Sequence, residues 1–125
     1  MKSIKISDAE LKVMKYIWEQ EGIKASNLVK LIKADLGWSR TTTYTQINRL
    51  IDKGAIKKDA SEFSCYSLVS KQLIQLEETQ HLIEKLYKGS RKLFLSAFLE
   101  QEKLTDEELN EIRQMIENVN RGMRE

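Results

Sequence analysis

The chain has 125 residues, of which 41% are hydrophobic and 32% charged, so it can form one domain or two small ones with an ordinary core. One cysteine excludes an internal disulfide framework, and the charged, proline-free composition indicates a mainly α-helical protein. No apolar run approaches the roughly 18 residues of a membrane span, and the N-terminal residues lack the apolar core of a signal peptide. We therefore expect a cytoplasmic protein with no membrane partner.

Charge is unevenly distributed along the chain. Residues 24–58 hold eight basic and two acidic residues, a balance of +6, whereas residues 71–125 hold nine basic and eleven acidic residues, a balance of −2. This asymmetry is typical of a polyanion-binding domain joined to a second unit.

A first helix is predicted to begin at Ser7 and to end at Gly22. Ser7 and Glu10 match a capping box, in which the serine accepts the Glu10 backbone N–H and the Glu10 side chain returns to Ser7. Trp18 falls on the apolar stripe of this helix, which favours a core position over a ligand platform.

A second helix is predicted over about residues 25–36, and Gly37 ends it. Only Gly37 and Trp38 separate it from Ser39, the predicted N-cap of a third helix. Two helices joined by a short turn that contains glycine are the signature of a helix-turn-helix. Three lysines on or beside the second helix would either contact phosphates or remain solvated: Lys24, Lys30 and Lys33.

The third helix, residues 39–53, is predicted to have two unlike faces, with Gly54 as its left-handed end residue. Its core face carries Thr43, Ile47, Leu50 and Ile51. The opposite face has hydrogen-bonding groups and two guanidinium groups but no carboxylate: Arg40, Thr41, Thr42, Tyr44, Thr45, Asn48 and Arg49. Such a face suits a DNA major groove, where carboxylates near phosphates are unfavourable.

Two alternatives remain for this stretch. The three consecutive threonines are β-branched and favour a strand, but a strand would leave Thr41, Thr43 and Thr45 together with no apolar face to bury. The polar face would also be compatible with a plain solvated surface. The helical, DNA-facing interpretation accounts for more of the residues.

Residues 55–69 are predicted to form a hairpin, with strands over 55–58 and 63–68 and a turn over 59–62. Three helices followed by a basic hairpin predict a winged helix-turn-helix, in which Lys57 and Lys58 flank the DNA backbone. Cys65 is expected to pack as a small hydrophobe. With His81 as the one histidine, far away in sequence, we expect no metal, no cofactor and no catalytic residue.

Three amphipathic helices are predicted after residue 70, over about 71–88, 90–101 and from 105 onward. The last carries a heptad stripe: Leu109, Ile112, Ile116, Val119 and Met123. Helices this short cannot bury all their apolar faces among themselves, so a second copy is the simplest partner, and packing back on the winged helix is the alternative. We assign the dimer contacts to Leu93, Phe94, Phe98, Leu109, Ile112, Ile116 and Val119. The predicted domains are thus 1–70, a winged helix, and 71–125, a helical dimerisation domain.

Four segments of the chain resemble the penicillinase and methicillin-resistance repressors (BlaI/MecI type), to which the copper-responsive CopY repressors are related. They are Ile6–Glu19, Trp38–Gly54, Tyr66–Ser70 and Leu95–Leu109. They follow the family's order and spacing over nearly the whole chain. The resemblance implies a homodimeric repressor whose third helix reads a palindromic operator in double-stranded DNA and whose C-terminal helices form the dimer.

The resemblance also assigns individual residues. The family's contact face falls on Thr41, Thr42, Tyr44, Thr45 and Arg49. Two departures bear on the operator preference, since Arg40 stands where proline is common and Tyr44 where a basic residue is common.

Relief of repression differs between branches of the family that the sequence resembles. In the β-lactam branch a protease cleaves an Asn-Phe bond in the dimerisation helices, and the matching pair here is Ala97-Phe98. The resemblance therefore implies a candidate cleavage site, with a regulatory sensor protease as a candidate partner. The copper branch carries paired C-terminal cysteines, which this chain lacks, so copper sensing through that site is excluded.

Two other functional classes fit less well. A winged helix that binds protein without DNA would not require the +6 segment or the acid-free helix face. An enzyme is disfavoured because the sequence has no phosphate-binding glycine loop and no clustered carboxylate site, and its one histidine and one thiol are far apart.

Overall fold

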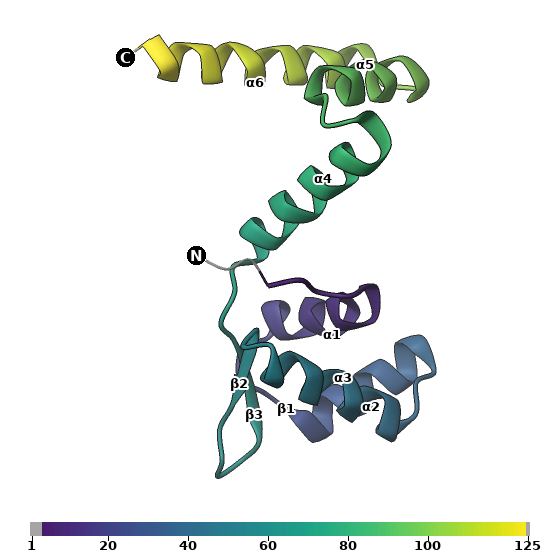
Figure 1. Ribbon diagram of the computed structural model, residues 1–125, viewed down its shortest axis with the longest axis vertical. Coiled ribbons are helices and arrows are strands. Elements are labelled where there is room, and N and C mark those ends of the chain that lie inside the picture. Colours follow the sequence, from purple (N-terminus) through teal and green to yellow (C-terminus); the bar gives the residue numbers. More distant parts are fainter. Residues whose placement is uncertain (1–3, 125) are drawn as a thin grey trace. The chain divides into compact units, whose positions relative to one another are not determined.

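The computed structural model describes residues 4–124 of a mainly α-helical chain (Figure 1). Two compact units divide at residues 76 and 77, within helix α4 (Lys71–Tyr87). The predicted domain boundary at residue 70 lies one residue before that helix, and it stays a prediction. The first turn of α4 belongs to the first unit, because Ile74 is buried in that unit's core.

The first unit contains three helices and a three-stranded sheet. Its elements in chain order are α1 (Asp8–Glu19), β1 (Ile23–Lys24), α2 (Ala25–Leu36), α3 (Arg40–Asp52), β2 (Ile56–Lys58) and β3 (Ser64–Ser67). The antiparallel sheet has the order β1-β3-β2. The hairpin of β2 and β3 extends away from the helices as a wing (Figure 1). This arrangement confirms the predicted winged helix-turn-helix.

Strand β1 is an element that the sequence did not predict. It has two residues, and Ile23 pairs with Cys65 of β3. So short a segment carries no alternating pattern of its own and becomes a strand only because β3 lies beside it.

Helix α3 forms where the sequence predicted a helix, which rules out the strand alternative. Ser39 Oγ accepts the backbone N–H of Thr42 at 3.2 Å, and Gly54 adopts a φ of 79°. The predicted core face is confirmed for Thr43, Ile47 and Leu50, which are fully buried, whereas Ile51 is half-buried. Gln46 is also buried, although its polarity gave no such indication.

The core of the first unit is built from all three helices and the sheet. Its largest fully buried side chains are Val13, Met14, Ile17, Leu28, Ile32, Ile47, Leu50, Ile56 and Cys65. Trp18 packs against this core, and its Nε1–H donates to the carbonyl of Val69 at 3.1 Å. The core role predicted for Trp18 is therefore confirmed, and the tryptophan also fixes the segment that leads into α4.

The predicted capping box of α1 is half wrong. Ser7 Oγ accepts the Glu10 N–H at 3.2 Å, as expected, but the Glu10 carboxylate does not return to Ser7. Glu10 is buried, with both carboxylate oxygens 2.7 Å from Lys53 Nζ. A buried carboxylate requires an opposite charge. The packing of α1 on α3 brings Lys53 to Glu10, and this ion pair is more favourable than the local capping bond to Ser7.

The second unit contains the rest of α4 together with α5 (Arg91–Gln101) and α6 (Asp106–Arg124). The three predicted helices are confirmed to within one or two residues. At the start of α6 the capping box forms in both directions: Thr105 Oγ1 accepts from Glu108 N at 3.1 Å, and Glu108 Oε1 accepts from Thr105 N at 3.2 Å.

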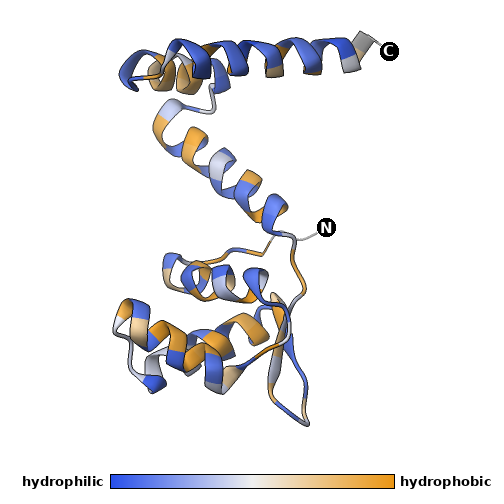
Figure 2. Cartoon of the chain, turned by 180° about the vertical axis from the view of Figure 1, so that it is seen from behind, coloured by the Kyte–Doolittle hydropathy of each residue, from blue (hydrophilic) through white to orange (hydrophobic). Residues whose placement is uncertain are grey.

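Many large apolar side chains on the helices of the second unit are exposed. Figure 2 shows hydrophobic residues recurring along these helices. Phe94 is half-buried between Tyr87 and Phe98, with ring centroids 5.5 and 6.3 Å away. In contrast, Leu93, Phe98, Leu109, Ile116 and Val119 are exposed, the last two by more than 60%. Within α5, all of which the structure describes, no residue is buried.

Candidate nucleic-acid interface

The outward face of α3 presents six of the seven side chains of this helix that the sequence assigned to DNA. They are exposed: Arg40, Thr41, Thr42, Thr45, Asn48 and Arg49. The one carboxylate of α3 is the exposed Asp52, the last residue of the helix, which follows Asn48 and Arg49 by one turn. Over residues 40–49 the face thus carries cations, hydroxyls and one amide, a composition that attracts phosphates and can meet base edges.

Hydrogen bonds at the start of α3 and within it determine which donors and acceptors its polar side chains still have free for DNA. Ser39 Oγ donates to Thr42 Oγ1 at 2.9 Å, and Thr45 Oγ1 donates to the Thr41 carbonyl at 2.9 Å. Thr42 therefore serves the N-cap, while Thr45 retains its methyl group and lone pairs. The Asn48 amide makes no hydrogen bond within the described part of the chain. Asn48 keeps both a donor and an acceptor, the pair that recognises adenine in the major groove.

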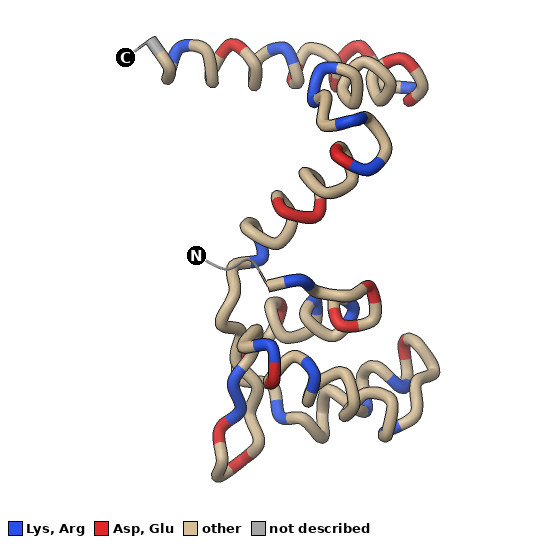
Figure 3. Tube along the Cα trace, in the orientation of Figure 1, with Lys and Arg blue, Asp and Glu red and all other residues tan. Residues whose placement is uncertain are grey.

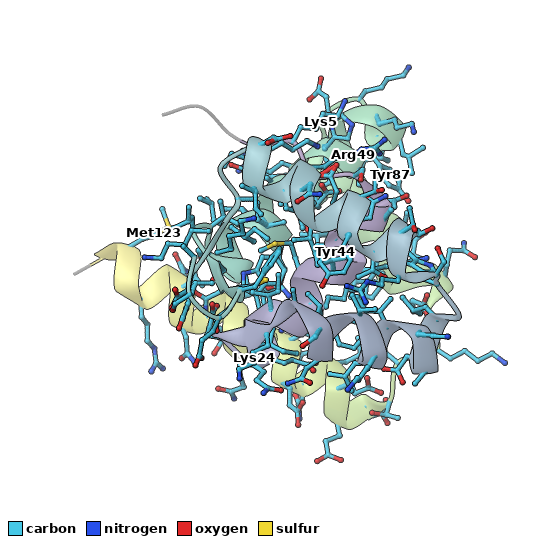
Figure 4. All side chains as sticks on the ribbon, turned by 90° about the horizontal axis from the view of Figure 1, so that it is seen from below. Lys5, Lys24, Tyr44, Arg49, Tyr87 and Met123 are labelled. Atoms are coloured by element: carbon cyan, nitrogen blue, oxygen red, sulfur yellow. The ribbon has the colours of Figure 1, made fainter. Side chains whose placement is uncertain are left out.

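Tyr44 differs from the other six residues, because its side chain is half-buried and packs against the core. Its ring meets Phe63 of the hairpin edge-on, with centroids 5.8 Å apart and an interplanar angle of 67°. The view from below places Tyr44 on the side of α3 that faces α2, whereas Arg49 lies on the other side of the helix (Figure 4). The structure thus places Tyr44 between helix and hairpin.

The hairpin carries its basic residues on β2 and its acidic residues at the tip (Figure 3). Lys57 and Lys58 are exposed, as predicted. Their ammonium nitrogens lie 5.9 Å from the Tyr66 ring centroid and 4.3 Å from the Phe63 ring centroid, respectively. Both distances are within the range of cation–π attraction. The strand β2, rather than the tip, is therefore the part of the hairpin suited to phosphates.

The tip is an ordered turn. Asp59 Oδ1 accepts hydrogen bonds from the backbone N–H and the hydroxyl of Ser61, both at 2.8 Å. The bond from the Ser61 backbone, followed by that from its side chain, lowers the pKa of Asp59 below its usual value. The tip therefore carries an acidic side chain, which is unfavourable close to phosphates.

The hairpin is tied to the helical part of the unit at two points, one at its base and one next to its tip. Glu21 accepts hydrogen bonds from the backbone N–H of Ser67, at 2.8 Å, and from the Ser67 hydroxyl. The carbonyl of Phe63 accepts from Ala25 N, at the start of α2, at 2.9 Å. Sequence reasoning missed Phe63; an isolated aromatic residue after a polar turn was the signal that could have found it.

The lysines on and beside α2 are a further group of exposed cations. Lys24, Lys30 and Lys33 are exposed, and within residues 4–124 no carboxylate forms an ion pair with them. Their charge is therefore not neutralised locally. In the described part of the chain, Lys53 is the lysine that a carboxylate does neutralise.

Other kinds of site find little support among residues 4–124. Cys65 is buried, as predicted, and burial raises the pKa of its thiol, which leaves little thiolate to react. In this part of the chain no three His, Cys, Asp or Glu residues are placed to hold a metal ion. Its helices also include none that is long and apolar enough to cross a membrane.

Comparison with known proteins decides the family. The family described as "Penicillinase repressor" matches residues 6–118. The chain belongs to the penicillinase repressor family. This is a family of transcriptional repressors and not of enzymes, and the resemblance noted in the sequence is confirmed.

Relatives of this repressor family match over most of their length. The methicillin resistance regulatory protein MecI of Mammaliicoccus sciuri is 37% identical over 117 residues, which cover 92% of this chain and 95% of the relative. The penicillinase repressor of Bacillus licheniformis is 36% identical over 121 residues, which cover 94% of each chain.

Solved structures from the family match a little over half of the chain. The solution structure of monomeric Bacillus licheniformis BlaI in complex with the blaP half-operator has a TM-score of 0.50 and 37% identity, covering 58% of this chain and 92% of that one. The DNA-binding domain of the repressor BlaI has a TM-score of 0.50 and 38% identity, covering 57% and 90%. The predicted winged helix is thereby confirmed as the family's DNA-binding fold.

Proposed function

We propose that this penicillinase-repressor family protein represses transcription as a homodimer bound to a palindromic operator in double-stranded DNA. Helix α3 enters the major groove, and β2 of the hairpin follows the adjacent phosphates. The observation that carries the proposal is the exposed face of α3 over residues 40–49, which has two guanidinium groups, several hydroxyls and the Asn48 amide but no carboxylate. The complex of the relative BlaI with a half-operator supports it.

The roles proposed for the exposed residues follow from their chemistry. Thr41, Thr45 and Asn48 face base edges, while Arg49 and the β2 lysines mainly neutralise phosphates. Thr42 completes the cap of the helix start, where its backbone N–H and its hydroxyl are both bonded to Ser39 Oγ. Helix N-termini favour phosphate binding because their free N–H groups point outward.

The proposed dimer forms through the second unit. Leu109, Ile116 and Val119 repeat at heptad spacing on α6, and they are exposed in the single chain. A symmetric pair of such helices would cover these side chains in both copies. Two α3 helices related by this symmetry would then reach successive major grooves, about one helical turn or 34 Å apart.

Relief of repression is proposed to occur by cleavage in α5 between Ala97 and Phe98. Phe98 is exposed by 44% and Ala97 is half-buried. Cleavage there would cut a helix that belongs to the proposed dimer interface, so the two DNA-binding units would no longer act together. A regulatory sensor protease is the proposed partner for this step.

Mobility-shift titrations with the full chain test the proposed function. The probes are promoter fragments, including the fragment upstream of the protein's own gene, and random duplexes of the same length. We expect tight binding to a fragment with a palindrome, two chains per site and strong salt dependence. Equally weak binding to every duplex would contradict the proposal and favour a protein-interaction module.

Replacing Lys57 and Lys58 together by alanine is expected to weaken binding to all DNA sequences alike. Each phosphate that the variant no longer neutralises should lower the slope of log K against log salt by about 0.9. Titrations at several salt concentrations measure this slope. The control is Lys12→Ala with Lys15→Ala, which removes the same charge from the exposed face of α1. An unchanged slope in the β2 variant would contradict the phosphate role.

Asn48→Ala is expected to weaken binding to the operator by about 1–3 kcal/mol, with little effect on random DNA, because the amide is the group best placed for base recognition. Thr45→Ala should show the same selectivity with a smaller loss, since its hydroxyl proton is used within the helix. Gln114→Ala, on the exposed surface of α6, serves as the control. Equal losses on operator and random DNA would show that Asn48 does not read bases.

A further inference from the structure

Four side chains form a continuous stack between the recognition helix and the hairpin, which we call the wing clasp: Arg40, Tyr44, Phe63 and Lys58. Arg40 Cζ lies 5.3 Å from the Tyr44 ring centroid. The Tyr44 and Phe63 rings meet edge-to-face at 5.8 Å, and Lys58 Nζ lies 4.3 Å from the Phe63 centroid. Each step is within the distance of an attractive aromatic or cation–π contact.

The two aromatic rings of the clasp come from separate elements of the unit. Tyr44 lies in the second turn of α3, and Phe63 lies just before β3. Both rings are half-buried and pack against the core of the unit, whereas the two cations at the ends of the stack are exposed. The clasp therefore joins the buried interior to the two outer surfaces proposed to meet DNA.

The backbone of Phe63 indicates that its position is specified. Its φ is +52°, in the left-handed region that bulky side chains rarely adopt. Hydrogen bonds hold it there, from Phe63 N to the Asp59 carbonyl at 2.8 Å and from Ala25 N to the Phe63 carbonyl at 2.9 Å. Strained residues that are held in place by their surroundings are often found at functional sites. In this protein the strained backbone places the Phe63 ring against the Tyr44 ring.

The wing clasp also restricts the conformations of the two cationic side chains at its ends, Arg40 and Lys58. A long basic side chain loses rotamer freedom when it binds a phosphate, and this loss weakens binding. Arg40 and Lys58 rest over ring faces before DNA arrives, so part of that ordering is already present in the free protein. Their separation is fixed by the rings between them.

We propose that Tyr44 and Phe63 are positioning residues, which hold the hairpin against α3 so that Arg40 and Lys58 meet the DNA backbone at a fixed spacing. Tyr44 in this role acts through its ring and does not read a base through its hydroxyl. The inference rests on the proposed function, since it assigns the way in which α3 and the hairpin bind one DNA molecule together.

Three variants of the full chain test the clasp in mobility-shift titrations over a salt series. Tyr44→Phe keeps the ring and removes the hydroxyl, and we expect its operator affinity to stay within about twofold. Tyr44→Ala and Phe63→Gly each remove a ring, and we expect about tenfold weaker binding. We also expect their salt slope to fall by about 0.9 for each chain, because one phosphate is no longer neutralised.

Phe63→Gly separates positioning from folding, because glycine accepts the left-handed backbone without strain. If Phe63 were only structural, this variant would lose affinity through reduced stability alone, and its salt slope would remain unchanged. Val13→Ala in α1 is the control for a general loss of stability, since Val13 is fully buried. Its salt slope should remain unchanged.

Two results would overturn the inference. One is a loss with Tyr44→Phe as large as that with Tyr44→Ala, which would assign base reading to the hydroxyl. The other is an unchanged salt slope in Tyr44→Ala and Phe63→Gly. If the unaltered protein showed no preference for any operator, the proposed function would fail. The role of Tyr44 and Phe63 could still be tested by the salt slopes on random duplex, because phosphate contacts do not depend on sequence.

Discussion

Replacing Ile116 and Val119 together by glutamate is expected to convert the proposed dimer into monomers and to abolish operator binding at concentrations where the unaltered protein binds. Burying each such side chain contributes about 1.5–3 kcal/mol. A symmetric interface contains each position twice. The loss is therefore at least about 6 kcal/mol, or about 10⁴-fold in the dimer dissociation constant. Sedimentation equilibrium measures the dissociation constant, and mobility shift measures the binding.

A matched variant separates the heptad stripe from charge alone. Gln114→Glu with Asn118→Glu adds the same two carboxylates to exposed positions of α6 outside the stripe. We expect this variant to remain dimeric and to bind the operator. Dissociation of both variants to the same extent would show that α6 does not pair through Ile116 and Val119.

Replacing Lys53 by methionine is expected to lower the free energy of unfolding of the first unit by about 3 kcal/mol. The change leaves the Glu10 carboxylate buried without its cation, and it removes the bond from Lys53 Nζ to the Lys5 carbonyl at 2.8 Å. The lower part of the usual range applies because the Lys53 side chain keeps 37% of its surface exposed. Both tryptophans, Trp18 and Trp38, lie in this unit, so urea unfolding followed by their fluorescence reports its stability.

Two companion variants make this result specific. Glu10→Met combined with Lys53→Met removes both charges, and we expect most of the lost stability to return. Lys15→Met removes one exposed lysine of α1, and its effect should stay within about 0.5 kcal/mol. A double variant as unstable as Lys53→Met would mean that packing of the lysine stem, and not the buried charge, accounts for the loss.

The sequence was sufficient to predict the helices and the hairpin, because their signals are local. Ser39, Gly54 and Thr105 are positioned by bonds within three residues or by backbone preference. The exposed face of α3 was predictable for the same reason, since helical spacing alone separates Asn48 from Ile47.

Interactions between elements could not be predicted from the sequence. Glu10 appeared to be a capping residue, and its partner lies 43 positions away. Tyr44 has the spacing of an outward-facing residue, but the ring of Phe63 provides a surface against which it packs. β1 has no signal of its own and exists only through its pairing with β3. In each case the outcome depends on the distance between two elements after folding.

The buried Cys65 gives the protein a built-in reporter of sheet opening. The thiol lies in β3, the central strand, where Cys65 is opposite Ile23 on one side and Lys58 on the other. An alkylating reagent can reach this sulfur only when the strands separate, since the side chain has no exposed surface. The rate of labelling in native buffer therefore reports how often the strands of the DNA-binding unit separate transiently, even though its average structure is unchanged.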